Sequence, residues 1–176
     1  MFATIYLPNF FLQASLRYFT KDSSARTDPA VAIIDEEEAK PVILQLNAVA
    51  EAAGVRAGMT PSQALARCLT LVIRARSAPQ EKAARDILLE QAFALTPFVE
   101  DTAPGLCTLE FTSTRNLPNK LTQTVAAMAA CQLAAQIGLG PTPDTSFLAA
   151  HLARPICEID NAKDFLAPLP IEILAL

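Results

Sequence analysis

The segment from position 52 to position 85 contains six cationic residues and only one acidic residue, Glu81. They give this segment a local charge of +5, and a surface of that sign can bind phosphate groups. The whole chain carries a formal net charge of −4, which is the wrong sign for a dedicated nucleic-acid binder. The sequence therefore predicts a local phosphate-binding lobe, with four candidate contacts: Arg56, Arg67, Arg74 and Arg76.

A solvated helix face is the competing interpretation of the same segment. Glu81 and Arg85 lie four residues apart, as do Lys82 and Asp86, and this spacing pairs opposite charges on a helix. The acidic run 35–38 is interpreted in the same way, as a solvated turn with no metal.

The thiols and the imidazole do not form a zinc site. The four cysteines are far apart in the sequence, no Cys-x-x-Cys pair occurs, and His151 is the only histidine. Structural zinc sites need four closely grouped ligands. We therefore expect reduced, buried thiols at Cys68, Cys107, Cys131 and Cys157.

The composition is that of a globular chain with a real core. The 176 residues are 52% hydrophobic and only 18% charged, which argues against disorder. The N-terminus lacks a basic region, Pro8 and Asn9 interrupt its apolar run, and no segment reaches the length of a membrane span. We predict a cytoplasmic protein. The apolar end, from 167 to 176, suggests that the natural chain continues.

The order of elements predicts an α+β fold of the ferredoxin-like type, a mixed and mainly antiparallel sheet with helices on one face. Gly54 should end one short helix, and Thr60 with Pro61 should begin the next. The expected strands are 3–7, 31–35, 41–46, 69–74, 98–102, 106–112, 135–139 and 156–159. The expected helices are 8–18, 48–53, 61–68, 79–96, 117–134, 144–152 and 162–166.

The stretch 46–71 resembles the fingers segment of the Y-family (UmuC/DinB-like) translesion DNA polymerases. The matching scaffold residues are Asn47, Gly54, Val55, Gly58, Met59, Ala64, Cys68 and Leu71. The resemblance implies a palm-like α/β domain over 1–47 and 78–168 with a fingers-like insertion at 48–77. Residues 169–176 would begin a linker to thumb and little-finger domains.

The resemblance also indicates where a polymerase would hold its two Mg²⁺ ions, which need carboxylate ligands. The metal-binding positions match Leu7, Gly105 and Leu106, and a further Asp position matches Asn9. The nucleotide-contacting Tyr, Arg and Lys match Ala48, Glu51 and Phe147. Replacement of an arginine by Glu51 reverses a charge interaction worth about 4 kcal/mol at 4 Å and an effective dielectric near 20.

Neighbouring carboxylates offer poor replacements. Glu100 and Asp101 precede the expected turn, and Glu110 lies about 13 Å along the strand from Leu106. We therefore expect no Mg²⁺ cofactor, no other metal site and no nucleotide site. A relocated set of carboxylates stays open as an alternative.

The chain keeps the scaffold residues of the family but lacks the metal-binding and nucleotide-binding residues. In this it resembles the catalytically inactive ImuB-like branch. The shared motifs are 7–13, 46–48, 58–68, 100–109, 140–143 and 165–170. The resemblance implies a pseudoenzyme in DNA repair and damage-induced (SOS) mutagenesis. Its implied partners are damaged or primer-template DNA, a sliding clamp, an error-prone replicative-type polymerase and an ImuA/RecA-like protein. The alternatives are an active nucleotidyltransferase with relocated carboxylates and an unrelated ferredoxin-like interaction module.

Overall fold

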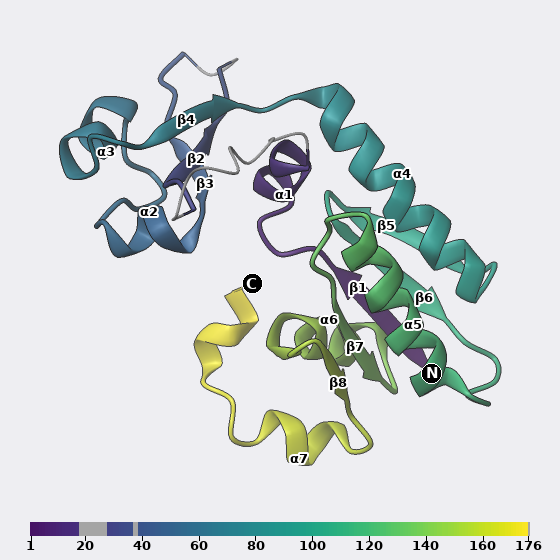
Figure 1. Cartoon of the computed structure of the whole chain (residues 1–176). Coiled ribbons are helices and arrows are strands. Elements are labelled where there is room, and N and C mark those ends of the chain that lie inside the picture. The colour runs from purple at the N-terminus through teal and green to yellow at the C-terminus, as the bar shows by residue number, and fades with distance from the viewer. Residues whose placement is uncertain (18–27, 37–38, 176) are drawn as a thin grey trace. The chain divides into compact units, whose positions relative to one another are not determined.

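The computed structural model describes residues 1–17, 28–36 and 39–175. The expected helix end at Tyr18, most of the 20–29 loop and part of the 36–40 turn lie outside the described residues. The chain divides into two compact units. The large unit joins Met1–Pro8 to Ala84–Leu176, and the small unit is Asn9–Ala83 (Figure 1).

A five-stranded sheet with the strand order β5-β6-β1-β7-β8 forms the large unit. Its central strand β1 pairs antiparallel with both β6 and β7. The pair β5–β6 is also antiparallel, and β7–β8 is parallel, so the predicted mixed, mainly antiparallel sheet is confirmed. The strands are β1 (Phe2–Tyr6), β5 (Val99–Ala103), β6 (Leu106–Glu110), β7 (Gln136–Gly140) and β8 (Ile156–Glu158).

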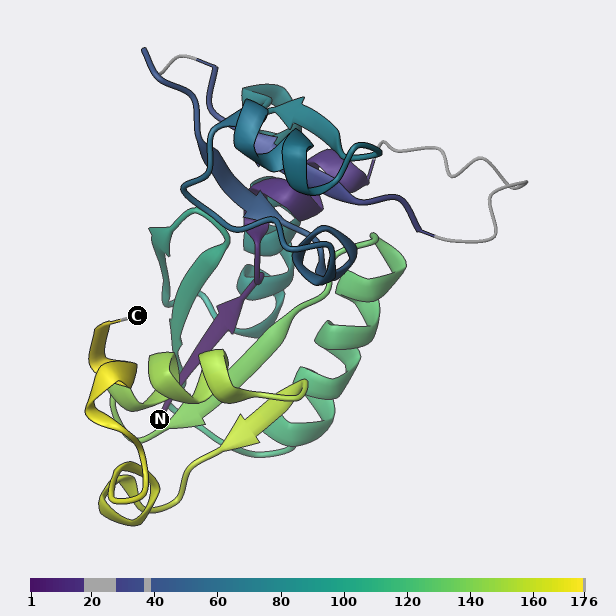
Figure 2. The ribbon, with the colours of Figure 1, turned by 90° about the vertical axis from the view of Figure 1, so that its left-hand side faces the viewer.

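Helices flank both faces of this sheet, and not only one face as was expected from the sequence (Figures 1 and 2). The two long helices, α4 (Ala78–Leu95) and α5 (Leu117–Ala130), bury Leu88, Leu121 and Met128 against one face. Helix α6 (Pro143–Leu152) lies on the other face, where the hydroxyl oxygens of Thr4 and Ser146 are 2.8 Å apart. Beyond the sheet follow α7 (Ala162–Leu166) and a 3₁₀ helix, Ile171–Ala175.

The expected helix 117–134 stops early, at Ala130. Gln132 adopts a positive φ of 60°, a conformation that a helix cannot contain. Helix α6 begins as its sequence suggests, because Thr142 and Thr145 form a reciprocal capping box.

The small unit is a three-stranded sheet with the order β3-β2-β4. Strands β2 (Val31–Ile34) and β3 (Ile43–Leu46) form the predicted antiparallel hairpin, and β4 (Val72–Ala75) pairs parallel with β2. The helices are α1 (Phe10–Leu16), α2 (Ala48–Ala52) and α3 (Pro61–Arg67).

This division differs from the predicted boundaries, which assigned only 48–77 to the small part. The hairpin 31–46 belongs to the small unit because β4 joins it in one sheet and shares its core. Asn47 connects the two segments: its Oδ1 accepts the N–H groups of Val31 and Ala50, each at 3.0 Å. None of the helices among the described residues is long and apolar enough to span a membrane.

Candidate functional site

The positions expected to carry metal ligands do come together in the large unit, at one end of β1 and β6. The N–H of Leu7 donates to the carbonyl oxygen of Gly105 at 2.7 Å, and Tyr6 pairs with Leu106. The Leu7 side chain is 0% exposed and that of Leu106 is 5% exposed. Gly105 has a φ of 77°, the left-handed region that favours glycine. The site is therefore a packed apolar corner around a tight turn.

The carboxylates nearest in sequence to this corner are either paired with another residue or exposed. Asp101 forms an ion pair with Arg85, and Glu100 and Glu110 are exposed on their strands. Among the residues that the structure describes, no three His, Cys, Asp or Glu side chains are placed to hold a metal ion. Asn9, at the start of the small unit, adopts the left-handed conformation and makes no side-chain cap for α1.

An aromatic stack includes Phe147, the position expected to carry a nucleotide-binding lysine. The ring of His151 lies 4.1 Å from that of Tyr6 and 4.4 Å from that of Phe147, between ring centres. The Nδ1 of His151 lies 3.0 Å from the Phe147 carbonyl oxygen, which can only accept, so Nδ1 carries the proton. Burial raises the pKa of Tyr6. His151 therefore packs between two aromatic rings, and its Nδ1 has a hydrogen-bond partner in its own helix.

Ala48 and Glu51, the other two nucleotide positions, lie in the first turn of α2. A carboxylate there is favoured by the partial positive charge of a helix N-terminus. Glu51 therefore has a structural reason to be acidic. Asn47, which precedes them, caps the helix with its side chain.

The four candidate phosphate-binding arginines differ in how much of their hydrogen-bonding capacity the fold uses. Arg56 donates to the carbonyl oxygens of Glu51 and Val55, at 2.6 and 2.8 Å. Arg74 donates to the carbonyl oxygen of Ser15 at 3.2 Å. Within the described residues, Arg67 makes no hydrogen bond or ion pair, and it is exposed on α3.

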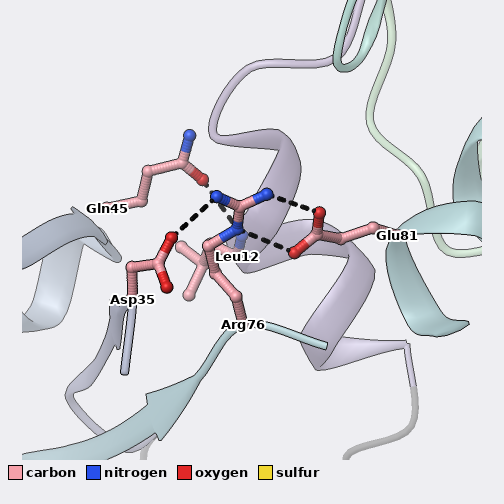
Figure 3. A network of polar contacts seen from close by, with 5 residues as sticks. All are labelled: Leu12, Asp35, Gln45, Arg76 and Glu81. Carbon is pink, nitrogen blue, oxygen red and sulfur yellow. Dashed lines mark hydrogen bonds and ion pairs between the residues drawn. The ribbon is translucent and has the colours of Figure 1, made fainter. Parts of the chain in front are cut away.

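Arg76 is held on three sides, and Figure 3 shows two of them, the carboxylates of Asp35 and Glu81. Its guanidinium bonds Asp35 at 3.0 Å and Glu81 at 2.8 Å, and it lies 4.0 Å above the ring centre of Phe11. The hydrogen bond to Glu81 raises the pKa of Arg76. The expected Glu81–Arg85 helix pair does not form, because Glu81 binds Arg76 and Arg85 binds Asp101.

Comparison with known proteins identifies the family. The family model described as impB/mucB/samB matches residues 5–151. The chain belongs to this family. The search of curated proteins found no match. The resemblance to the UmuC/DinB-like superfamily is thereby confirmed, and the alternative of an unrelated ferredoxin-like module does not hold.

Several solved structures have a similar fold over nearly the whole chain. The insertion ternary complex of Dbh DNA polymerase is 14% identical with a TM-score of 0.82. The post-insertion binary complex of the same polymerase is 15% identical with a TM-score of 0.84. DinB from Sulfolobus solfataricus is 15% identical with a TM-score of 0.79. Each match covers 98% of this chain but only 52–53% of the other. The chain thus has the polymerase fold and spans about half the length of these proteins.

The residues present do not fit the Mg²⁺ ions that polymerase chemistry requires. Mg²⁺ takes oxygen ligands, and the corner formed by Leu7, Gly105 and Leu106 offers only backbone oxygens and buried methyl groups. The resemblance alone located this corner in the sequence. Sequence reasoning missed the packing role of Tyr6, although Gly138 and Gly140, opposite Thr4 and Phe2, signalled a close backbone approach on that face.

Substitution of Arg76 by alanine should destabilise the small unit by about 1–2 kcal/mol, because it removes two partly exposed ion pairs and a cation–π contact. Arg67→Ala should change stability by less than about 0.5 kcal/mol. Chemical denaturation of both variants tests this difference. Equal losses would contradict the assignment of Arg76 as a structural residue.

Cys68, Cys131 and Cys157 are partly exposed, so the expectation of buried thiols holds only for Cys107. Cys107 should therefore resist alkylation in the native protein. Its thiol is fully buried beside Leu106, and this burial raises its pKa to about 12. The thiolate is the reactive form, so native Cys107 should stay unmodified at about pH 8 while Cys68, Cys131 and Cys157 react. Mass spectrometry after iodoacetamide treatment, with and without denaturant, measures this. Native labelling of Cys107 at the rate of the others would disprove its burial.

Proposed function

We propose that this chain is a non-catalytic polymerase-like domain of the ImuB-like type. The observation that carries the proposal is the apolar corner. A catalytic site would need carboxylates at Leu7, Gly105 and Leu106, and two of these side chains are buried hydrocarbon. These side chains cannot bind the two metal ions that phosphoryl transfer by a polymerase requires. The domain therefore contributes its fold and its surface to the process, and the chemistry is done by another protein.

The process that we propose is DNA repair by damage-induced translesion synthesis. The support is family membership together with a fold shared with DNA polymerases. In this role the domain acts as an accessory or scaffold for an error-prone replicative-type polymerase on damaged or primer-template DNA. The further proposed partners are a sliding clamp and an ImuA/RecA-like protein, and the proposed location is the cytoplasm.

The contact that this chain makes with DNA should be weak. Arg76 is held by its own unit, and Arg56 and Arg74 donate to backbone carbonyl groups. Arg67 is the most available of the four candidates, since it is exposed and has no partner among the described residues. We propose Arg67 as the main DNA contact of the small unit, with an affinity that falls as salt rises.

Primer extension tests the proposal. The natural protein that contains this domain is incubated with a primed template, deoxynucleotides and either Mg²⁺ or Mn²⁺, with Dbh DNA polymerase as the positive control. We expect no extension. Extension that survives repurification, and that is lost in Glu100→Gln or Glu110→Gln, would instead establish the active nucleotidyltransferase with relocated carboxylates.

A further inference from the structure

The outer edge of β5 offers free backbone groups. β5 ends the sheet, with β6 as its only partner strand in the described chain (Figure 1). The carbonyl of Phe98 accepts the N–H of Glu110 at 3.0 Å. Because hydrogen-bonded pairs alternate along an antiparallel ladder, the N–H and C=O groups of Val99 and Asp101 point away from β6. An extended peptide binds a sheet edge through groups of this kind.

A pocket lies beside this edge, on the sheet face that carries Glu100. Its volume is about 270 Å³. Phe98, which is 55% exposed, forms part of its wall together with Phe2, Val99 and Pro143. Side chains at alternate positions of a strand share a face. A strand added beside β5 would therefore direct every second side chain to the face on which this pocket lies. The pocket can take one apolar side chain.

The rim of the pocket is acidic. Glu100 and Glu110 both line it, and neither side-chain carboxylate makes a hydrogen bond or ion pair within the described residues. The cations nearby are engaged elsewhere: Arg85 binds Asp101, and the α-amino group of Met1 donates to the carbonyl of Phe111 at 3.5 Å. A ligand that brings positive charge to this rim would gain an attraction that the protein itself leaves unused.

The same charges exclude two other occupants. Two β5 edges that paired with each other would bring Glu100 and Asp101 against like charges, and cross-strand pairs of like charge are destabilising. Nucleic acid would be repelled by the rim.

We propose that β5 and its pocket bind an extended segment of another protein. The segment adds to the sheet as a strand, places an aromatic or branched apolar side chain against Phe98, and sets a lysine or arginine two residues away opposite Glu100. This inference rests on the edge of β5, the pocket beside it and the charge of its rim, and it holds whether or not the domain is catalytic.

A positional-scanning library of short peptides tests the proposal. The peptides alternate threonine with variable residues, so that all variable side chains lie on one strand face. Binding to the whole chain is followed by fluorescence anisotropy up to about 1 mM peptide, the weak end of specific binding. We expect enrichment of an apolar residue flanked by lysine or arginine, and slower amide exchange at Val99 and Asp101. Absence of any binder, or enrichment of acidic residues, would overturn the proposal.

Two matched pairs of variants locate the binding. Phe98→Ser should weaken binding of the selected peptide by about fivefold or more, which is the effect of losing about 1 kcal/mol. Phe93→Ser is its control, because Phe93 has nearly the same exposure, 56%, but lies outside the pocket. This control should change peptide binding little. Glu100→Lys should likewise weaken binding, and Glu158→Lys on the opposite edge strand should not. Equal effects within either pair would also refute the assignment.

Discussion

Replacing Gly138 with alanine should destabilise the large unit by about 3 kcal/mol or more, the upper range for overpacking a core. A Cβ atom at Gly138 would lie closer than 3.0 Å to backbone atoms of Ala150, Ser146 and Ala149. Backbone atoms of α6 cannot move aside as a side chain can, so the helix would have to separate from β7. Urea unfolding followed by circular dichroism measures the loss.

Gly54→Ala is the matched control for this substitution. Gly54 has a φ of 88°, and no atom lies within 4 Å of an added Cβ. Its replacement should therefore cost only the strain of a left-handed alanine, about 1–2 kcal/mol. If Gly138→Ala costs no more than Gly54→Ala, then α6 does not pack on β7 as the structure describes.

Leu7→Asp should destabilise the large unit by about 4 kcal/mol near neutral pH, because an unpaired carboxylate would be buried where the wild-type leucine is 0% exposed. Burial without a partner raises the pKa of the introduced aspartate above its unfolded value of about 3.9. The loss is then fully present above the raised pKa, and it shrinks as the pH falls toward the unfolded value.

Leu7→Asn separates this charge effect from the loss of the leucine side chain. It has a similar shape to aspartate but cannot ionise, so its stability deficit should not follow the same pH dependence. The two variants should converge in free energy of unfolding at about pH 4, where the aspartate is neutral. Addition of Mn²⁺ should not raise the melting temperature of Leu7→Asp. A metal-dependent rise would mean that neighbouring oxygens still form a cation site.

Local signals in the sequence predicted local structure well. The Thr60-Pro61 start of α3 is confirmed by a capping box with Gln63. Gly54, which was expected to end a short helix, has the positive φ of such an end, 88°. In each case the residues that determine the conformation are close together in the chain, so backbone preferences alone are sufficient.

Partners that are far apart in sequence were harder to predict. Arg76 binds Asp35 across 41 positions, and that contact depends on the parallel pairing of β2 with β4. A strand's own pattern of apolar residues does not specify its neighbour, so the sheet β3-β2-β4 and its unit boundary were not foreseen. The Glu81–Arg85 pair failed for the same reason: its members found better-placed partners in other elements.

The candidate site was predictable only through resemblance. Nothing in the types of Leu7 and Leu106 marks them as functional, since buried leucines are the commonest core residues. Their place at the joined ends of β1 and β6 became evident only when the Y-family frame was laid over the sequence. Tyr6 and His151, which stack beside them, gave no comparable signal.

Calorimetric titration of the chain with a deoxynucleoside triphosphate and Mn²⁺ tests the central claim most directly. Leucine, glycine and phenylalanine occupy the positions where the family resemblance implies metal and triphosphate contacts. We predict no saturable heat up to millimolar nucleotide, which corresponds to a binding free energy weaker than about −4 kcal/mol. Saturable binding that requires the metal would contradict the account, since it would show that other carboxylates hold the two ions and that the domain retains a nucleotide site.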